Sequence, residues 1–288
     1  MPLTASTIFP RERVTVVGVL NTTPDSFSDG GRLVDDRDAA NVDAAVAAAA
    51  QMIDAGAQMI DVGGESTRPG ALEIPQAIEI DRTAPVVEAL AKRFAVAISI
   101  DTRKAAVAEA AIEAGARIVN DVSGLRFDAA LADVAAAAGA SLIVGHLRGT
   151  PETMQQNPHF DDVLAEVISE LGVSLAAARA AGIPDERLAV DPGIGFGKRL
   201  EDNLALLANA GSIGASLGLP VLVGPSRKAF LGSLTGDPVE CRDAATAAAC
   251  AVAIFAGADA VRVHDVTGAI RAAAVAAALR DARREAIA

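Results

Sequence analysis

Cysteine and histidine are scarce in this sequence, which limits the metal chemistry it can support. Among 288 residues there are two cysteines and three histidines, and no two of them have the spacing of a zinc site or of a redox-active Cys-x-x-Cys motif. Cys241 and Cys250 are nine residues apart, and we expect them to share one helix as small buried thiols in a reducing compartment. The sequence therefore gives no support for a metal site made only of His and Cys.

The sequence also lacks a long uncharged apolar run and an excess of positive charge. No stretch of eighteen apolar residues occurs without a charge or a glycine, and residues 1–13 contain no apolar segment of the kind that a secretion signal needs. Lys and Arg number 25 against 37 Asp and Glu, a formal net charge of −12, which argues against nucleic acid or a membrane as a partner. We therefore expect a cytoplasmic protein that holds any anionic ligand through a few local groups.

What the sequence has in abundance is small and branched apolar residues, and some of them form a repeat. Hydrophobic residues make up 51% of the chain, enough for a large core. The pattern Ala-Gly-Ala, one variable residue and two apolar residues occurs four times, at 55–60, 114–119, 138–143 and 256–261. Three copies lead directly to Asp61, Asn120 or Arg262, and the fourth is soon followed by His146. The repeat predicts a helix that passes into a strand with a polar residue at its end.

Short β-branched runs alternate with longer alanine-rich runs along the whole chain, which is typical of βα units around a parallel sheet. Eight such units close into a barrel more naturally than they spread into an open sheet, and 288 residues is near the roughly 250 of such barrels. We expect an α/β fold, a single-domain (β/α)8 TIM barrel over residues 14–288 after an N-terminal extension of residues 1–13. The predicted strands are 14–20, 59–63, 97–101, 117–120, 141–145, 187–191, 220–224 and 260–263, and the predicted helices are 39–55, 75–94, 104–114, 128–138, 160–181, 201–210, 242–256 and 266–288.

The alternative fold is an open Rossmann-like sheet, and the sequence gives it little support. No predicted strand-to-helix turn carries G-x-G-x-x-G. The glycine-rich segment 193–198 also fails the P-loop pattern, because Arg199 stands where a Ser or Thr would bind magnesium.

Two long polar segments follow the first and second predicted strands. Residues 21–31 begin with Asn21 and include Phe27, and residues 61–70 offer the Thr67 hydroxyl and the Arg68 guanidinium on a glycine-rich backbone. Both are candidate ligand-binding loops. The alternatives are an Asx- and Ser-rich turn for the first and a surface ion pair between Arg68 and Glu65 for the second.

Other polar residues end later strands. Asp101 and Asp191 accept hydrogen bonds from ring N–H and amino groups, Asn120 both donates and accepts, and Lys228 donates to a carbonyl or ring nitrogen. Around one barrel mouth this set is suited to a flat nitrogen heterocycle, whereas Asp101 or Asp121 taken alone would be read as a helix N-cap.

The last predicted strand carries Arg262 and His264, which lie on the same side of an extended chain and suit a phosphate-type oxyanion. Of the other histidines, His159 fits a structural role and His146 stays open. Magnesium held mainly by diphosphate oxygens and one protein amide would leave little trace in a sequence.

Seven motifs occur in an order that resembles the bacterial dihydropteroate synthase family, from about residue 14 to the final helix. They are residues 18–31, Asp61-Val-Gly-Gly-Glu-Ser-Thr-Arg-Pro-Gly70, Ser99-Ile-Asp-Thr102, Asn120-Asp-Val122, Asp191-Pro-Gly-Ile-Gly-Phe-Gly-Lys198, Ser226-Arg-Lys228 and Arg262-Val-His-Asp265. The resemblance implies a transferase of folate biosynthesis. It would condense 6-hydroxymethyl-7,8-dihydropterin diphosphate with 4-aminobenzoate to give 7,8-dihydropteroate and pyrophosphate.

The resemblance also assigns roles to residues of this chain. The pterin ring would be read by Asp101, Asn120, Asp191 and Lys228. The magnesium ion would be contacted by Asn21, and the diphosphate would be held by Arg68, Arg262 and His264. The aminobenzoate pocket would include Phe27, Thr67, Pro69, Phe196 and the segment at Lys228. The family further suggests a homodimer.

Two positions depart from the family pattern, and two other functions compete with the synthase. Gly145 stands where many relatives have Met, which predicts less side-chain bulk at the pterin pocket, and Ala229 replaces a common Ser, which leaves only a backbone N–H for the aminobenzoate carboxylate. The competing functions are a catalytically silent pterin-binding paralogue and a pterin-dependent methyltransferase. The second would not need the Thr67-Arg68-Pro69 segment or Ser226-Arg227-Lys228.

Overall fold

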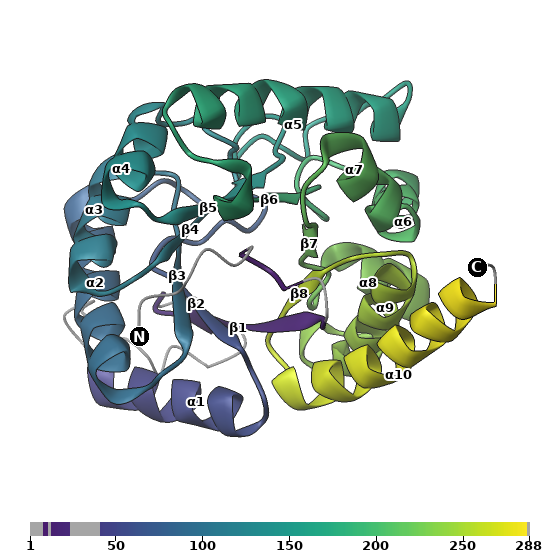
Figure 1. The fold of residues 1–288 in the computed structure, drawn as a ribbon, viewed down its shortest axis with the longest axis horizontal. Coiled ribbons are helices and arrows are strands. Elements are labelled where there is room, and N and C mark those ends of the chain that lie inside the picture. The colour runs from purple at the N-terminus through teal and green to yellow at the C-terminus, as the bar shows by residue number, and fades with distance from the viewer. Residues whose placement is uncertain (1–7, 11–12, 24–40, 287–288) are drawn as a thin grey trace.

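Eight parallel strands form a barrel that a ring of helices surrounds (Figure 1). The computed structural model describes residues 8–10, 13–23 and 41–286. The strands are β1 (Thr15–Asn21), β2 (Met59–Gly63), β3 (Ala97–Asp101), β4 (Ile118–Asp121), β5 (Ser141–Gly145), β6 (Leu188–Asp191), β7 (Leu222–Val223) and β8 (Ala260–Val263). The neighbour order is β6-β5-β4-β3-β2-β1-β8-β7, and a bridge between Val190 and Val221 joins the two ends. The predicted (β/α)8 barrel is confirmed, and the open-sheet alternative is wrong.

The helices follow the strands as predicted, with two additions. They are α1 (Val42–Asp54), α2 (Gln76–Arg93), α3 (Ala105–Ala114), α4 (Ala130–Ala138), α5 (Val163–Ala180), α6 (Leu200–Ala208), α7 (Ala210–Leu217), α8 (Ala229–Thr235), α9 (Asp243–Phe255) and α10 (Val266–Glu285), with 3-10 turns at Asp185–Arg187 and Val239–Cys241. The additions are α7 and α8, in segments where the sequence predicts no helix. No described helix has the length and apolar character that a membrane span requires.

The Ala-Gly-Ala repeat is a helix end followed by a strand. In each of the four copies the glycine has a positive φ, between +65° and +126°, a conformation that non-glycine residues rarely adopt. The N–H of the alanine after it donates to the carbonyl five residues back, at 2.9 Å in all four copies, which is the bond of a Schellman motif. The same end closes α5 at Gly182, where the Ile183 N–H reaches Ala178 O at 3.1 Å. One local device therefore turns five helices back towards the barrel.

Two layers fill the barrel interior, and they differ in polarity. The layer at the amino-terminal end of the strands is apolar and contains Phe9, Val17, Met59, Ile118, Ile143, Ala189, Leu222 and Ala260. Two residues further along, on the same face of each strand, the positions include Asp61, Ser99, Asn120, Asp191 and Arg262. We call the apolar layer the apolar plug. We call the polar layer, which lies nearer the carboxyl ends of the strands, the polar floor. Phe9 comes from the predicted N-terminal extension, and it is fully buried in the plug.

The two cysteines differ from the prediction. Cys250 is buried in α9, but Cys241 is exposed and ends the 3-10 turn Val239–Cys241. Pro238 caps that turn, and Arg242 separates it from α9. The expectation of two buried thiols in one helix is therefore wrong for Cys241.

Candidate active site

A cavity of about 840 Å³ lies at the carboxyl ends of the strands. Most of the predicted site residues line it, namely Asn21, Thr67, Arg68, Pro69, Asp101, Phe196, Lys228, Arg262 and His264. Asn120 and Asp191 are buried in the polar floor below it. Phe27 lies outside the described residues. The structure therefore brings together groups from the ends of seven strands, β1–β4 and β6–β8, as the strand-end positions predicted.

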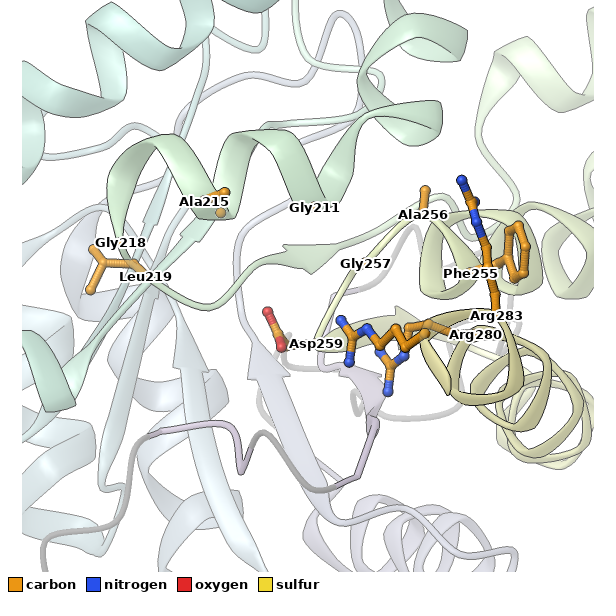
Figure 2. A pocket seen from close by; sticks show the side chains of 12 residues that line it. Gly211, Ala215, Gly218, Leu219, Phe255, Ala256, Gly257, Asp259, Arg280 and Arg283 are labelled. Atoms are coloured by element: carbon orange, nitrogen blue, oxygen red, sulfur yellow. The ribbon is translucent and has the colours of Figure 1, made fainter. Parts of the chain in front are cut away.

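A second cavity of about 600 Å³ lies elsewhere, between α7 and the ends of α9 and α10 (Figure 2). Its walls include Gly211, Phe255, Arg280 and Arg283, beside Asp259, which precedes β8. That position is at the opposite end of the strand from the predicted site. The cavity at the carboxyl ends is therefore the candidate active site, as in other barrel enzymes.

Arg262 is held between two carboxylates in the floor of the cavity. Its Nε donates to Asp61 Oδ2 at 2.5 Å and its Nη2 donates to Asp101 Oδ2 at 2.6 Å. The same Asp61 oxygen accepts the Asn120 Nδ2 at 3.0 Å. These contacts join β2, β3, β4 and β8 in one network. The predicted site contained three of the four residues and omitted Asp61, although Asp61 follows a copy of the repeat directly.

Asp101 and Lys228 both have pKa values near neutral pH. Burial, together with Asp61 and Glu79, raises the pKa of Asp101 to about 7, while Arg262 and Lys228 act in the opposite direction. Burial and the charge of Arg262 lower the pKa of Lys228 to about 8. A ligand that donates to the carboxylate or accepts from the amine will therefore change the proton count of the site.

Lys228 reaches the cavity across the loop after β6. Its Nζ lies 3.7 Å from the centre of the Phe196 ring, a close cation–π contact. A Cβ on Gly195, whose φ is +81°, would come within 2.9 Å of the lysine Cδ, so glycine is needed at that position. Asp191 Oδ1 accepts the Gly193 N–H at 2.7 Å and helps to hold this loop.

Ser226, Arg227 and Lys228 all line the cavity, and Arg227 is anchored there by an ion pair with Asp243. Arg227 has φ +55°, and its Nε and Nη2 bind the Asp243 carboxylate at 2.7 and 2.8 Å. Ser226 Oγ accepts the His264 N–H at 3.1 Å and lies 2.8 Å from His264 Nδ1. Ser226 belongs to one of the sequence motifs, but the sequence predicts no role for it, because its partner His264 is 38 residues away.

His264 is a neutral hydrogen-bonding group in this site. Burial, with the positive charges of Arg227, Arg262 and Arg68, lowers its pKa to about 3. The Ser226 hydroxyl can donate its hydrogen to Nδ1, an arrangement in which the ring proton is carried by Nε2. The two residues predicted to bind an oxyanion are therefore one permanent cation, Arg262, and one neutral imidazole, His264.

Buried charges fix the base of the loop that carries Thr67 and Arg68. Glu65 accepts the Arg103 Nε at 3.0 Å and the Lys104 Nζ at 2.7 Å, and its side chain is 4% exposed. Glu65 is thus a buried anchor bound by two cations, and the alternative of a surface ion pair with Arg68 does not describe this loop.

The sequence did not decide the role of His146, and the structure places it in a buried hydrogen-bond network next to the cavity. Its Nδ1 lies 2.9 Å from Lys198 Nζ and its Nε2 lies 3.1 Å from Glu170 Oε2. Burial and the charge of Lys198 lower the pKa of His146 to about 3. Lys198 also donates to Phe196 O at 3.0 Å, so this lysine ties the Phe196 loop to the end of β5. His159 is exposed and contacts Asp161 Oδ1 at 3.1 Å.

Gly145 does not leave the open space that its small size predicted. A Cβ at this position would lie 2.6 Å from Val122 Cα and 2.7 Å from Asp121 O. The backbone after β4 therefore occupies the volume next to Gly145, and the ends of β4 and β5 are packed in direct contact.

The fold and the site together define a barrel enzyme that binds a polar heterocycle and an anion at the carboxyl ends of its strands. A model of the family described as pterin binding enzyme matches residues 17–264, and the chain belongs to this family, among the dihydropteroate synthases. It is 43% identical over 257 residues to the dihydropteroate synthase of Synechocystis sp., covering 88% of this chain and 86% of the relative. The enzyme of Escherichia coli is 44% identical over 254 residues, with 87% and 86% covered.

Solved structures agree with these relatives. A Yersinia pestis dihydropteroate synthase with a sulfonamide drug complex superposes with a TM-score of 0.89 at 41% identity, covering 94% of this chain and 96% of that one. A Xanthomonas albilineans dihydropteroate synthase with 4-aminobenzoic acid superposes with a TM-score of 0.84 at 42% identity, with 94% of both chains covered.

Proposed function

We propose that this chain catalyses the condensation of 6-hydroxymethyl-7,8-dihydropterin diphosphate with 4-aminobenzoate, giving 7,8-dihydropteroate and pyrophosphate. The observation that carries the proposal is the shared cavity: heterocycle-reading and anion-binding groups from separate strands meet there, in a chain 41–44% identical to dihydropteroate synthases. Folate biosynthesis is the process that this reaction serves.

Four polar side chains at the carboxyl ends of the strands are suited to the pterin ring. Asp101 and Asp191 supply acceptors for ring N–H and amino groups, Asn120 supplies an amide, and Lys228 supplies a donor. We assign the ring to these residues. The Phe196 side chain, stacked against the Lys228 amine, forms one wall.

The upper part of the cavity is suited to the diphosphate and to aminobenzoate. Arg262, Arg68 and His264 offer N–H donors to phosphate oxygens, and only the two arginines carry a charge. Thr67, Pro69 and the backbone N–H of Ala229 border the space that remains, and we assign this space to aminobenzoate. The family pattern adds Phe27 to the same pocket.

The reaction breaks the bond between the exocyclic methylene carbon and the diphosphate oxygen, and forms a bond from that carbon to the aminobenzoate nitrogen. Charge accumulates on the departing pyrophosphate, where Arg262 and Arg68 stabilise it more strongly than in the ground state. The positive charge on the methylene group spreads into the ring, which Asp101 and Asp191 face. The nitrogen loses one proton after attack, so that dihydropteroate and pyrophosphate are the products.

Magnesium fits the donor set beside β1. Asn21 ends β1 beside its register partner Gly63 and lines the cavity, where its amide oxygen is an oxygen donor of the kind that a hard cation takes. The described residues contain no cluster of three His, Cys, Asp or Glu side chains for a metal. We propose that Asn21 contacts an ion held mainly by diphosphate oxygens and water. Such an ion would neutralise charge on the leaving group.

We also propose that the protein acts in the cytoplasm as a homodimer. Several large apolar side chains on α9 and α10 are exposed, namely Val252, Phe255, Val275 and Leu279. A patch of this kind on neighbouring helices is suited to a second copy. Analytical ultracentrifugation measures the oligomeric state directly.

The test of the reaction is pyrophosphate release from the purified protein. Release that requires the pterin diphosphate, aminobenzoate and magnesium, with an equal amount of dihydropteroate, supports the synthase. Binding of the pterin diphosphate without any release would instead identify a silent pterin-binding paralogue.

A further inference from the structure

One carboxylate oxygen connects two parts of the candidate site that come from distant strands. Asp61 Oδ2 accepts the Arg262 Nε at 2.5 Å and the Asn120 Nδ2 at 3.0 Å, and Asp61 is only 1% exposed. Its partners are 201 and 59 residues away along the chain. In the barrel, β8 and β4 lie on opposite sides of β2, each separated from it by one strand. Asp61 therefore bridges the barrel interior beneath the cavity.

This bridge decides which atoms of its partners face the ligand. A carboxylate only accepts hydrogen bonds, so the Asn120 amide must turn its nitrogen towards Asp61, and its oxygen is left on the other side. On Arg262, Asp61 holds Nε while Asp101 holds Nη2 at 2.6 Å. Two bonds at separate nitrogens fix the plane of the guanidinium, whereas one bond to Asp101 would let that plane rotate.

We infer that Asp61 is a positioning residue of this site, one that orients the ring-reading Asn120 and the diphosphate-binding Arg262 through a single carboxylate. The inference rests on the proposed function for the identity of the two ligand groups. Asp61 itself is not among the residues that line the cavity, so it acts through its partners. It thereby links recognition of the ring to recognition of the leaving group.

The surroundings of Asp61 provide both a mild variant and a matched control. Among the described residues, Asp61 Oδ1 has no hydrogen-bond partner, so Asp61→Asn can place its amide nitrogen there and keep an acceptor for Arg262 and Asn120. Ser99 is the register partner of Asp61 on β3. Its buried hydroxyl likewise has no partner in the described part of the chain. Ser99→Ala is therefore a change at the same depth that removes none of these bonds.

The experiment compares Asp61→Ala, Asp61→Asn and Ser99→Ala with the unchanged protein. Calorimetry measures the affinities for 6-hydroxymethylpterin, which probes the ring side, and for pyrophosphate, which probes the leaving-group side. Steady-state kinetics gives kcat and the KM of each substrate, and thermal unfolding reports the fold. We expect Asp61→Ala to lower kcat/KM for the pterin diphosphate about 100-fold, the size of effect that misplaced catalytic groups produce. Both probe ligands should also bind it more weakly.

The conservative variant separates positioning from a purely structural role. Asp61→Asn should lose only about tenfold, because its neutral oxygen makes weaker hydrogen bonds than a carboxylate but keeps their directions. Ser99→Ala should stay within about twofold of the unchanged protein, since no hydrogen bond is removed. The KM for aminobenzoate should stay constant in all three variants.

Wild-type affinity of Asp61→Ala for both probe ligands would overturn the inference. The inference would also be overturned if Asp61→Asn and Asp61→Ala lost activity equally and in proportion to the fraction of protein that is unfolded. Should Asp61→Ala fail to fold, the affinities of Asp61→Asn decide the question alone, and unchanged values would refute it. If the unchanged protein shows no turnover, the proposed function fails, but the two probe affinities still test the positioning role.

Discussion

The replacement Lys228→Ala tests the ring-binding site at a residue that lines the cavity. The lysine lines the cavity, its amine stacks on Phe196 at 3.7 Å, and its charge acts on both Asp101 and Asp191. Burial and Arg262 lower the pKa of this amine to about 8, so the free protein holds the charged amine against a penalty. Alanine removes that penalty, and we expect the variant to fold.

The expected loss of activity has two physical sources. A hydrogen bond from a charged donor contributes about 1.5–3 kcal/mol, and each 1.36 kcal/mol corresponds to a tenfold rate. The missing contact alone therefore lowers kcat/KM for the pterin diphosphate by about 10- to 150-fold. In addition, the pKa of Asp101 rises above about 7 without Lys228, and more of the carboxyl is protonated at pH 7.5. We therefore expect a loss in the upper part of that range, about 100-fold, at that pH.

The loss should shrink as the pH rises, and this distinguishes the mechanism from a general defect. At pH 9 Asp101 ionises again in the variant, while Lys228 of the unchanged protein has passed its own pKa of about 8 and is mostly neutral. The assay is pyrophosphate release between pH 6.5 and 9, with Lys92→Ala as the control, a lysine whose side chain is 72% exposed. Near-normal turnover of Lys228→Ala at pH 7.5 would refute the assignment of the pterin site.

Four further outcomes follow from the same structure. Calorimetry in buffers of different ionisation enthalpy should show that pterin binding releases protons at pH 6.5, where Asp101 is largely protonated, and takes them up at pH 9, where Lys228 is largely neutral. Gly145→Ala should destabilise the fold by about 1–3 kcal/mol in urea unfolding, because its methyl group meets backbone; an unchanged midpoint would contradict the packing described. The native protein should react with one equivalent of a thiol reagent, at Cys241, and with two only when unfolded. Ala229→Ser should lower the KM for aminobenzoate about fivefold by adding one hydrogen bond; a higher KM would place that carboxylate elsewhere.

The strand positions were predictable because their signals are local. Four strands, β2, β3, β5 and β8, begin and end at the predicted residues. Before β2 and β8, the glycine of the repeat fixes the helix end, and the apolar pair that follows starts the strand. Helix α7 was missed because two glycines within it, at 211 and 214, weaken the helical signal. Its first turn is instead held by packing on Gly257, where the two backbones come into contact.

The site was predictable as a set of residues but not as a set of partners. Strand-end positions were enough to group Asp101, Arg262 and Lys228. No local pattern indicates that Asp61 would hold Arg262, 201 residues away, or that Lys198 would reach His146, 52 residues away. Those pairings depend on which side chains the closed barrel points at one another.

The apolar plug at the amino-terminal end of the barrel has a practical consequence for shortening this protein. Phe9 lies outside the first strand, yet it is fully buried among the plug residues, and the Ile8 N–H next to it binds Glu186 O at 3.2 Å. A chain begun at residue 14, where the sequence alone places the domain, would lose this cover. Water would then reach the amino-terminal ends of the strands, and the exposed apolar residues of the plug would promote aggregation. Purification tags therefore belong upstream of Ile8, with the segment up to the first strand left in place.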